Sequence, residues 1–168
     1  MFVVLVGPSY SGKSTVCEYF KRYYEEQGLP MYVVCPDDIR EELLGDANDQ
    51  SNGKMIFETA YERVDKMLHS PLNTVFFDAT SLTPARRKPL IEIAKRNRVT
   101  CFAVTMPDFT EKELTARAEN RERKVPLDVV HAQKQRMVRP DVKEGFDYIM
   151  EIPKFSLDVM KEKLNESE

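Results

Sequence analysis

The sequence has few of the residues that cross-link a chain, bind zinc or anchor it in a membrane. Its three cysteines, Cys17, Cys35 and Cys101, are an odd number and lie far apart, which favours free thiols in a reducing compartment. His69 and His131 are also far apart, and no ligand-spaced Cys/His cluster argues for zinc. No apolar run approaches the roughly 18 residues of a membrane span, and no basic leader precedes the first apolar run. We expect a cytoplasmic protein without membrane contact.

The composition predicts one folded domain over residues 1–168. Of these residues 42% are hydrophobic and 32% are charged, which excludes a mostly disordered chain. The net charge of −3 argues against a generic nucleic-acid binder. The basic residues nevertheless gather in the second half of the chain. They predict either solvated helix faces or a local site for a polyanionic ligand.

Apolar runs alternate with amphipathic segments along the whole chain. Strands are predicted at residues 2–6, 31–35, 74–77, 99–105 and 146–152. Helices are predicted at residues 13–27, 38–44, 53–68 and 84–97, from residue 110, at 126–138 and at 156–165, the last capped by Ser156. This order predicts a three-layer α/β fold, a parallel sheet of about five strands with helices on both faces.

A phosphate-binding motif joins the first strand to the first helix. It fits G-x-x-x-x-G-K-[ST] and consists, with the residue that follows, of Gly7, Pro8, Ser9, Tyr10, Ser11, Gly12, Lys13, Ser14 and Thr15. Its backbone N–H groups can form an anion nest at a helix N-terminus. Lys13 can reach the β- and γ-phosphates, and the Ser14 hydroxyl can bind Mg²⁺. The alternative is a chance glycine turn.

The end of the third strand helps to separate classes of phosphate-loop protein. Asp78 could bind the water of a Mg²⁺ ion near Ser14, or it could cap the next turn. It is followed by Ala79, whereas a rotating or translocating ATPase usually has a glutamate there. The N-K-x-D sequence of guanine-specific switches is also missing. Both features favour a small kinase-like enzyme.

A carboxylate and an arginine follow the second strand. Because parallel strands open onto one crevice, Asp37 and Arg40 are expected near the phosphate loop. Asp37 could accept the proton of an acceptor hydroxyl, and Arg40 could hold an acceptor anion. The alternative is that Asp37 or Asp38 caps a helix and Arg40 lies on the surface.

A basic segment covers residues 117–124. In a helix, Arg117 and Arg121 lie one turn apart, where they could close over a nucleotide as part of a lid at about residues 110–126. The alternative is a solvated helix with ion pairs along its surface.

Three further patterns, in this order, resemble the kinase module of phage and bacterial polynucleotide 5′-hydroxyl kinases. They are the D-x-x-R of residues 37–40, the D-A-T-x-x-x-P-x-R-R of residues 78–87, and the R-x-x-x-R of residues 117–121 followed by Val125 and Pro126. With the phosphate loop, the resemblance reaches to about Val138. Tyr10 and Ser81 stand where relatives often carry glycine and asparagine.

The resemblance implies an ATP- and Mg²⁺-dependent transfer of the γ-phosphate to a 5′-hydroxyl end of DNA or RNA. In it, Asp37 is the base and Arg40 grips the acceptor phosphate, while Thr80, Val125 and Pro126 belong to the acceptor site. The ATP side comprises the phosphate loop with Lys13 and Ser14, together with Arg117 and Arg121, of which Arg121 stabilises the transition state.

Two other functions stay open, a kinase for a small molecule and a nucleotide-dependent binding protein or switch. The sequence does not fix the preference for DNA or RNA, the acceptor length or the oligomeric state. Tyr19, Tyr23 and Tyr24 are predicted to pack around one helix rather than stack on bases. Arg86, Arg87 and Lys88 are expected on the surface, where they could also contact an acceptor strand.

Overall fold

The protein is described here by a computed structural model of residues 1–119 and 124–166. Within them, parallel strands form one sheet in the order β2-β3-β1-β4-β5. The strands are β1 (Phe2–Val6), β2 (Met31–Val34), β3 (Thr74–Phe77), β4 (Cys101–Thr105) and β5 (Tyr148–Glu151). Val3 pairs with Phe76 of β3 on one side and with Phe102 of β4 on the other, so β1 is central. The predicted parallel sheet is confirmed.

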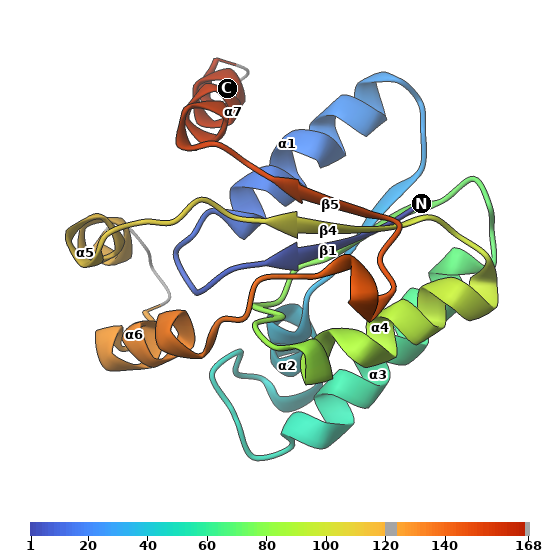
Figure 1. Ribbon diagram of the computed structural model, residues 1–168, viewed down its shortest axis with the longest axis horizontal. Helices are drawn as coiled ribbons and strands as arrows, with labels where there is room; N and C mark the ends of the chain where they lie inside the picture. Colours follow the sequence, from blue (N-terminus) through green and yellow to red (C-terminus); the bar gives the residue numbers. More distant parts are fainter. Residues whose placement is uncertain (120–123, 167–168) are drawn as a thin grey trace.

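Helices lie on both faces of the sheet and beyond one of its edges. They are α1 (Lys13–Glu26), α2 (Pro36–Leu44), α3 (Gly53–Leu68), α4 (Pro84–Asn97), α5 (Glu111–Glu119), α6 (Leu127–Arg136) and α7 (Lys154–Asn165), with a short 3₁₀ helix at Val142–Glu144. The crossover from β1 to β2 runs opposite to the later ones. Right-handed crossovers therefore place α1 on one face and α2–α4 on the other. Figure 1 shows α1 and α7 above the sheet and α3 and α4 below it.

The central strand feeds both halves of the core because its side chains alternate between the faces. Val3 and Leu5 pack with Val16 of α1 and Leu157 of α7. Phe2, Val4 and Val6 belong to the second cluster, which includes residues of α3 and α4. All five β1 residues are buried, as their continuous apolar run predicts.

The structure corrects several element boundaries. The last helix begins at Lys154, and Pro153 rather than Ser156 is its N-cap. The backbone N–H groups of Ser156 and Leu157 both donate to the Pro153 carbonyl, which places Ser156 inside the first turn. The fourth and fifth strands are shorter than the apolar runs that predicted them, because the runs extend into the flanking turns.

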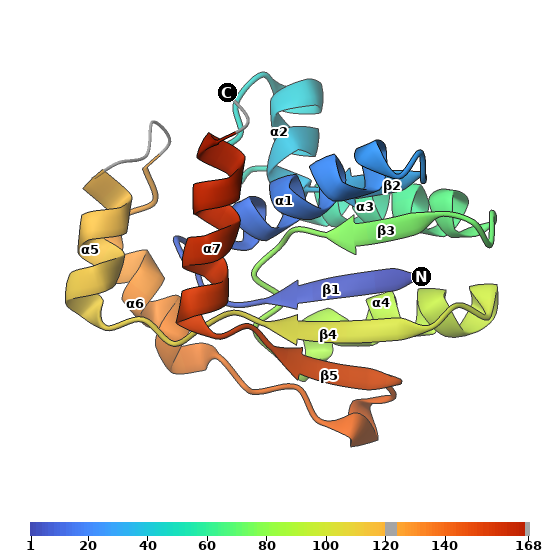
Figure 2. The same ribbon diagram turned by 90° about the horizontal axis from the view of Figure 1, so that it is seen from above.

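The carboxyl ends of the strands converge on one edge of the sheet. Figure 2 shows α5 and α6 beyond these ends, separate from the two helical layers. This edge holds the phosphate loop, the start of α2 and the loop after β3, so it positions the candidate site. In the part of the chain that the structure describes, no helix is both long enough and apolar enough to cross a membrane.

Candidate active site

The phosphate loop connects β1 to α1, and its backbone geometry depends on glycine. Gly12 has φ +98°, a left-handed conformation that side chains rarely adopt, and a Cβ there would lie 2.6 Å from Leu157 of α7. α1 begins at the next residue, Lys13. The loop therefore presents a helix N-terminus at the edge of the sheet, as the motif predicts.

Lys13 lies inside the loop that it is predicted to serve. Only 8% of the residue is exposed, and its ammonium donates to the carbonyls of Gly7 at 3.2 Å and Pro8 at 2.7 Å. Burial lowers the pKa of Lys13, while the negative charges of Asp78 and Asp37 act to raise it. The two carboxylates thus help to keep a buried cation at the phosphate position.

Residues that follow β4 in the chain form hydrogen bonds with Ser9 and Tyr10 of the phosphate loop. The Ser9 N–H donates to Gln133 of α6 at 2.8 Å, and the Tyr10 hydroxyl donates to the Val125 carbonyl at 2.9 Å. Arg117 donates to the Tyr10 carbonyl at 3.3 Å, so it lies beside the loop, where the sequence places it. No local pattern signalled the roles of Gln133 and the Tyr10 hydroxyl.

The basic segment is described only in part. The Arg117 guanidinium carbon lies 3.9 Å from the centre of the Phe109 ring, which fixes the side chain next to the phosphate loop. Arg121, predicted to contact the ATP phosphates, lies outside the described residues.

Ser14 and Asp78 form an oxygen pair beside the phosphate loop. The Ser14 hydroxyl donates to the Asp78 carboxylate at 3.1 Å. Burial raises the pKa of Asp78, whereas Lys13 and the Ser14 hydrogen bond act to lower it. A hydroxyl and a carboxylate suit a hard cation such as Mg²⁺, which keeps several waters and phosphate ligands. Among the described residues, no group of three or more His, Cys, Asp or Glu side chains could hold a metal.

Asp37 and Arg40 lie in the first turns of α2 and form an ion pair. The N-cap of α2 is Cys35, so neither Asp37 nor Asp38 caps it. Arg40 is only 6% exposed, which rules out the surface alternative. Its Nε has no hydrogen-bond partner in the described part of the chain. A buried guanidinium with an unused donor is costly unless a ligand fills the position.

One cavity brings the predicted acceptor residues together. Its volume is about 800 Å³, and its walls include Asp37, Arg40, Asp78, Thr80, Val125 and Pro126, together with Ser9 of the phosphate loop. Ser81 also lines it. Its buried Oγ lacks a partner among the described atoms, and its φ of +45° lies in the left-handed region that residues other than glycine rarely adopt. The cavity thus joins the phosphate loop to unsatisfied polar groups.

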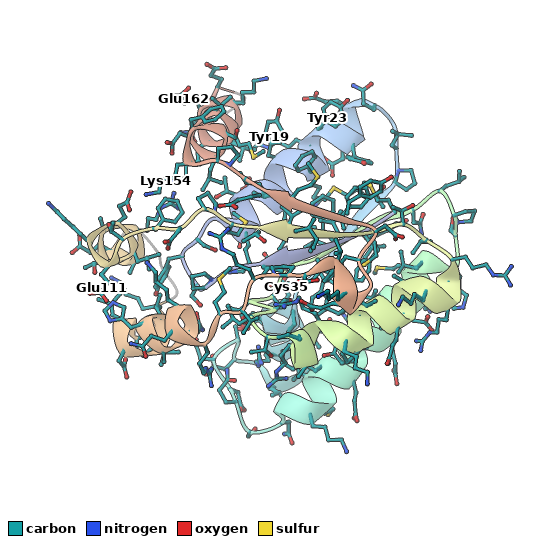
Figure 3. The ribbon with its side chains drawn as sticks, viewed as in Figure 1. Tyr19, Tyr23, Cys35, Glu111, Lys154 and Glu162 are labelled. Carbon is teal, nitrogen blue, oxygen red and sulfur yellow. The ribbon has the colours of Figure 1, made fainter. Side chains whose placement is uncertain are left out.

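Several other residues singled out in the sequence lie elsewhere. Figure 3 shows Tyr19 and Tyr23 along α1, above the sheet and away from α2 and α6. Tyr19 makes an edge contact with the Phe20 ring, which supports the packing interpretation. The prediction that Arg87 lies on the surface is wrong. Arg87 is fully buried and pairs with Glu144 at 2.7 Å, so it is a core residue and not a surface contact.

Solved structures with similar folds include nucleotide-bound proteins. Chaetomium thermophilum Kti12 in complex with ADP-AlF3 is 17% identical with a TM-score of 0.73, covering 99% of this chain and 98% of that chain. The Mycobacterium tuberculosis APS kinase CysC, in complex with AMPPNP and APS, is 19% identical with a TM-score of 0.62, and the match covers 98% of this chain and 95% of that chain. A chain of a Pnkp1/Rnl/Hen1 complex is 25% identical with a TM-score of 0.56, and the match covers 69% of this chain and 38% of that chain.

Sequence comparison gives the family. No curated protein matches the chain significantly. A family model described as AAA domain matches residues 2–140, which contain the phosphate loop and all the described residues that line the cavity. Together with the parallel sheet and the kinase-type neighbours, this match shows that the chain belongs to this AAA domain family and has a P-loop kinase fold.

Proposed function

We propose that the protein transfers the γ-phosphate of ATP to the 5′-hydroxyl end of DNA or RNA. One observation carries this proposal: Asp37 and the buried Arg40, with its unused Nε, line the cavity that Ser9 of the phosphate loop also lines. An acceptor in this cavity meets a carboxylate and a cation next to the phosphate donor. That combination suits a hydroxyl that neighbours a phosphate.

On the donor side, the loop N–H groups and Lys13 would hold the ATP phosphates. Arg117, already beside Tyr10, would lie along the nucleotide, and Arg121 is assigned to the transferring phosphate from the sequence alone. Ser14 and Asp78 would hold Mg²⁺, directly or through water. The ion would neutralise charge on the phosphates.

On the acceptor side, Asp37 would take the proton of the 5′-hydroxyl. The hydroxyl oxygen bonds to the γ-phosphorus, the bond to the β,γ-bridging oxygen breaks, and ADP leaves. Arg40 would hold the phosphate next to the acceptor nucleoside. Thr80 would contribute a polar group to the wall, and Val125 with Pro126 an apolar surface for the nucleoside.

The order of the patterns at residues 37–40, 78–87 and 117–126, which resembles that of polynucleotide 5′-hydroxyl kinases, supports a polynucleotide acceptor. A second candidate is a small anionic acceptor, because the similarity to the APS kinase spans 98% of the chain. A nucleotide-dependent binding protein or switch has less support, since Ala79 follows Asp78 where a motor ATPase usually has a glutamate, and the N-K-x-D sequence of guanine-specific switches is missing.

Asp37→Asn tests the proposed base. We expect phosphate transfer to fall on the order of 10²–10⁴-fold, with ATP affinity unchanged, because the side chain keeps its size and loses its basicity. The matched control is Asp38→Asn, which removes a carboxylate from an exposed neighbour on the same helix. Transfer rates and equilibrium ATP binding are measured for both. Normal turnover by Asp37→Asn would contradict the assignment.

A further inference from the structure

Two arginines of the cavity use the same aromatic ring. The guanidinium carbon of Arg40 lies 5.9 Å from the centre of the Phe57 ring, and that of Arg86 lies 4.9 Å from it. Phe57 lies on α3 and packs against the Tyr61 ring at 6.1 Å and against the core cluster below the sheet. A ring fixed by the core therefore holds both cations at one end of the cavity.

Arg86 differs from its neighbours on α4 in its charge partners. Arg87 pairs with Glu144, and Lys88 lies 4.0 Å from Glu92. The ion pairs among the described residues include none with Arg86, although its side chain is exposed and lines the cavity. Its charge is available for a ligand. Stacking on Phe57 limits its rotamers, so less conformational entropy is lost on binding.

The charges around the cavity favour an acceptor with more than one anion. Besides Arg40 and Arg86, the walls carry Lys124 and Arg136, both exposed. The carboxylates among the described wall residues are Asp37 and Asp78. Asp37 pairs with Arg40, and Asp78 accepts the Ser14 hydroxyl, so these acids do not neutralise the outer cations.

We propose that Arg86, held on Phe57, binds the second phosphate of the acceptor strand, next to the phosphate assigned to Arg40. This inference rests on the proposed function and adds that the preferred acceptor carries at least two phosphates. The shared ring places Arg86 beside Arg40, so the second phosphate is assigned to Arg86 rather than to Lys124, which precedes α6, or to Arg136 of α6. A nucleoside 3′-monophosphate engages Arg40 alone, and a dinucleotide with a 3′-phosphate engages both arginines.

The test compares these two acceptors in Arg86→Gln, with Lys88→Gln as the control that removes one charge from the same helix outside the cavity. Equilibrium binding is measured for thymidine 3′-monophosphate and for the dithymidine 3′-phosphate, alongside phosphate transfer. In Arg86→Gln we expect about tenfold weaker binding of the dinucleotide and unchanged binding of the mononucleotide. The slope of log affinity against log salt should shrink by about 0.7 for the dinucleotide only.

Phe57→Leu keeps an apolar side chain on α3 and removes the ring, so we expect a smaller loss with the same acceptor dependence. Equal losses for both acceptors, or no change in Arg86→Gln, would overturn the inference while leaving phosphate transfer intact. Absence of dinucleotide binding by the unmodified protein would also overturn it. Conversely, Arg86-dependent binding without any phosphate transfer would support this subsite and contradict the proposed function.

Discussion

Tyr10 adopts a backbone conformation that usually belongs to glycine. Its φ is +65°, in the left-handed region, where a non-glycine residue costs about 1–2 kcal/mol. The hydroxyl offsets this cost by bonding both the carbonyl and the N–H of Val125, 115 residues away. Through this contact the phosphate loop positions Val125 and Pro126, which line the proposed acceptor cavity.

Tyr10→Phe should therefore affect the acceptor more than the nucleotide. The backbone of the loop is unchanged, but Val125 and Pro126 lose their anchor. We expect the acceptor KM to rise about three- to tenfold, since one or two hydrogen bonds are lost, with the ATP KM unchanged. Steady-state kinetics with each substrate varied in turn provide the measurement. A rise confined to the ATP KM would contradict this role.

Arg87 shows how a basic residue in a charged stretch can belong to the core. Its guanidinium forms two bonds to the Glu144 carboxylate and two more to the carbonyls of Ser81 and Val138. Without the guanidinium, the nearly buried Glu144 carboxylate and the two carbonyls lose their hydrogen-bond donor. Arg87→Met should lower the free energy of unfolding by about 3–5 kcal/mol.

Urea unfolding measures this effect. Lys88→Gln, on the same helix, is the control and should change stability by less than about 0.5 kcal/mol. If Arg87→Met unfolds at the urea concentration of the unmodified protein, the buried network contributes no net stability.

At the scale of elements, the glutamate of the capping box at the start of α5 forms an ion pair with α7. Glu113 accepts from the backbone N–H and the hydroxyl of Thr110, and the Lys154 ammonium at the start of α7 bonds both of its oxygens at 2.8 and 2.9 Å. Figure 3 shows Lys154 on the side of α7 that faces α5. These bonds lower the pKa of Glu113 to about 2 from its ordinary 4.5, Lys154 being the largest cause.

The stability that Glu113 contributes should depend on pH. Because its pKa is lower in the folded state, the contribution is complete above about pH 4.5 and is lost as the pH falls toward 2. The difference in urea midpoint between the unmodified protein and Glu113→Gln should shrink from about pH 6 to about pH 3. Glu111→Gln, in the same turn, serves as the control. A constant difference would contradict the ion pair.

The elements that the sequence predicted well are those encoded by local patterns. The continuous apolar run of residues 2–6 and the glycines of the phosphate loop specify a buried strand and a tight turn without reference to distant residues. Tyr10–Val125, Arg87–Glu144 and the two arginines on Phe57 join residues far apart in the chain. A single sequence contains no signal for such pairs, so these contacts could be identified only from the structure.

At the scale of the whole molecule, the fold brings charged residues from the acidic and the basic halves of the chain together. Asp37 and Asp78 come from the acidic first half, while Arg86, Lys124 and Arg136 come from the basic second half, and all line one cavity. Crossover topology brings these segments to the same sheet edge. A protein with a net charge of −3 thus carries a local group of cations at this cavity.

The most direct measurement of the central claim is transfer of labelled γ-phosphate from ATP with Mg²⁺ to a panel of acceptors. The panel contains 5′-hydroxyl DNA and RNA, matched strands that already carry a 5′-phosphate, a nucleoside, and the small acceptor APS. We predict label on the 5′-terminal nucleotide of the 5′-hydroxyl strands, none on the 5′-phosphorylated strands, and loss of this label in Asp37→Asn. Label on a small acceptor alone, or phosphate released only to water, would contradict the account.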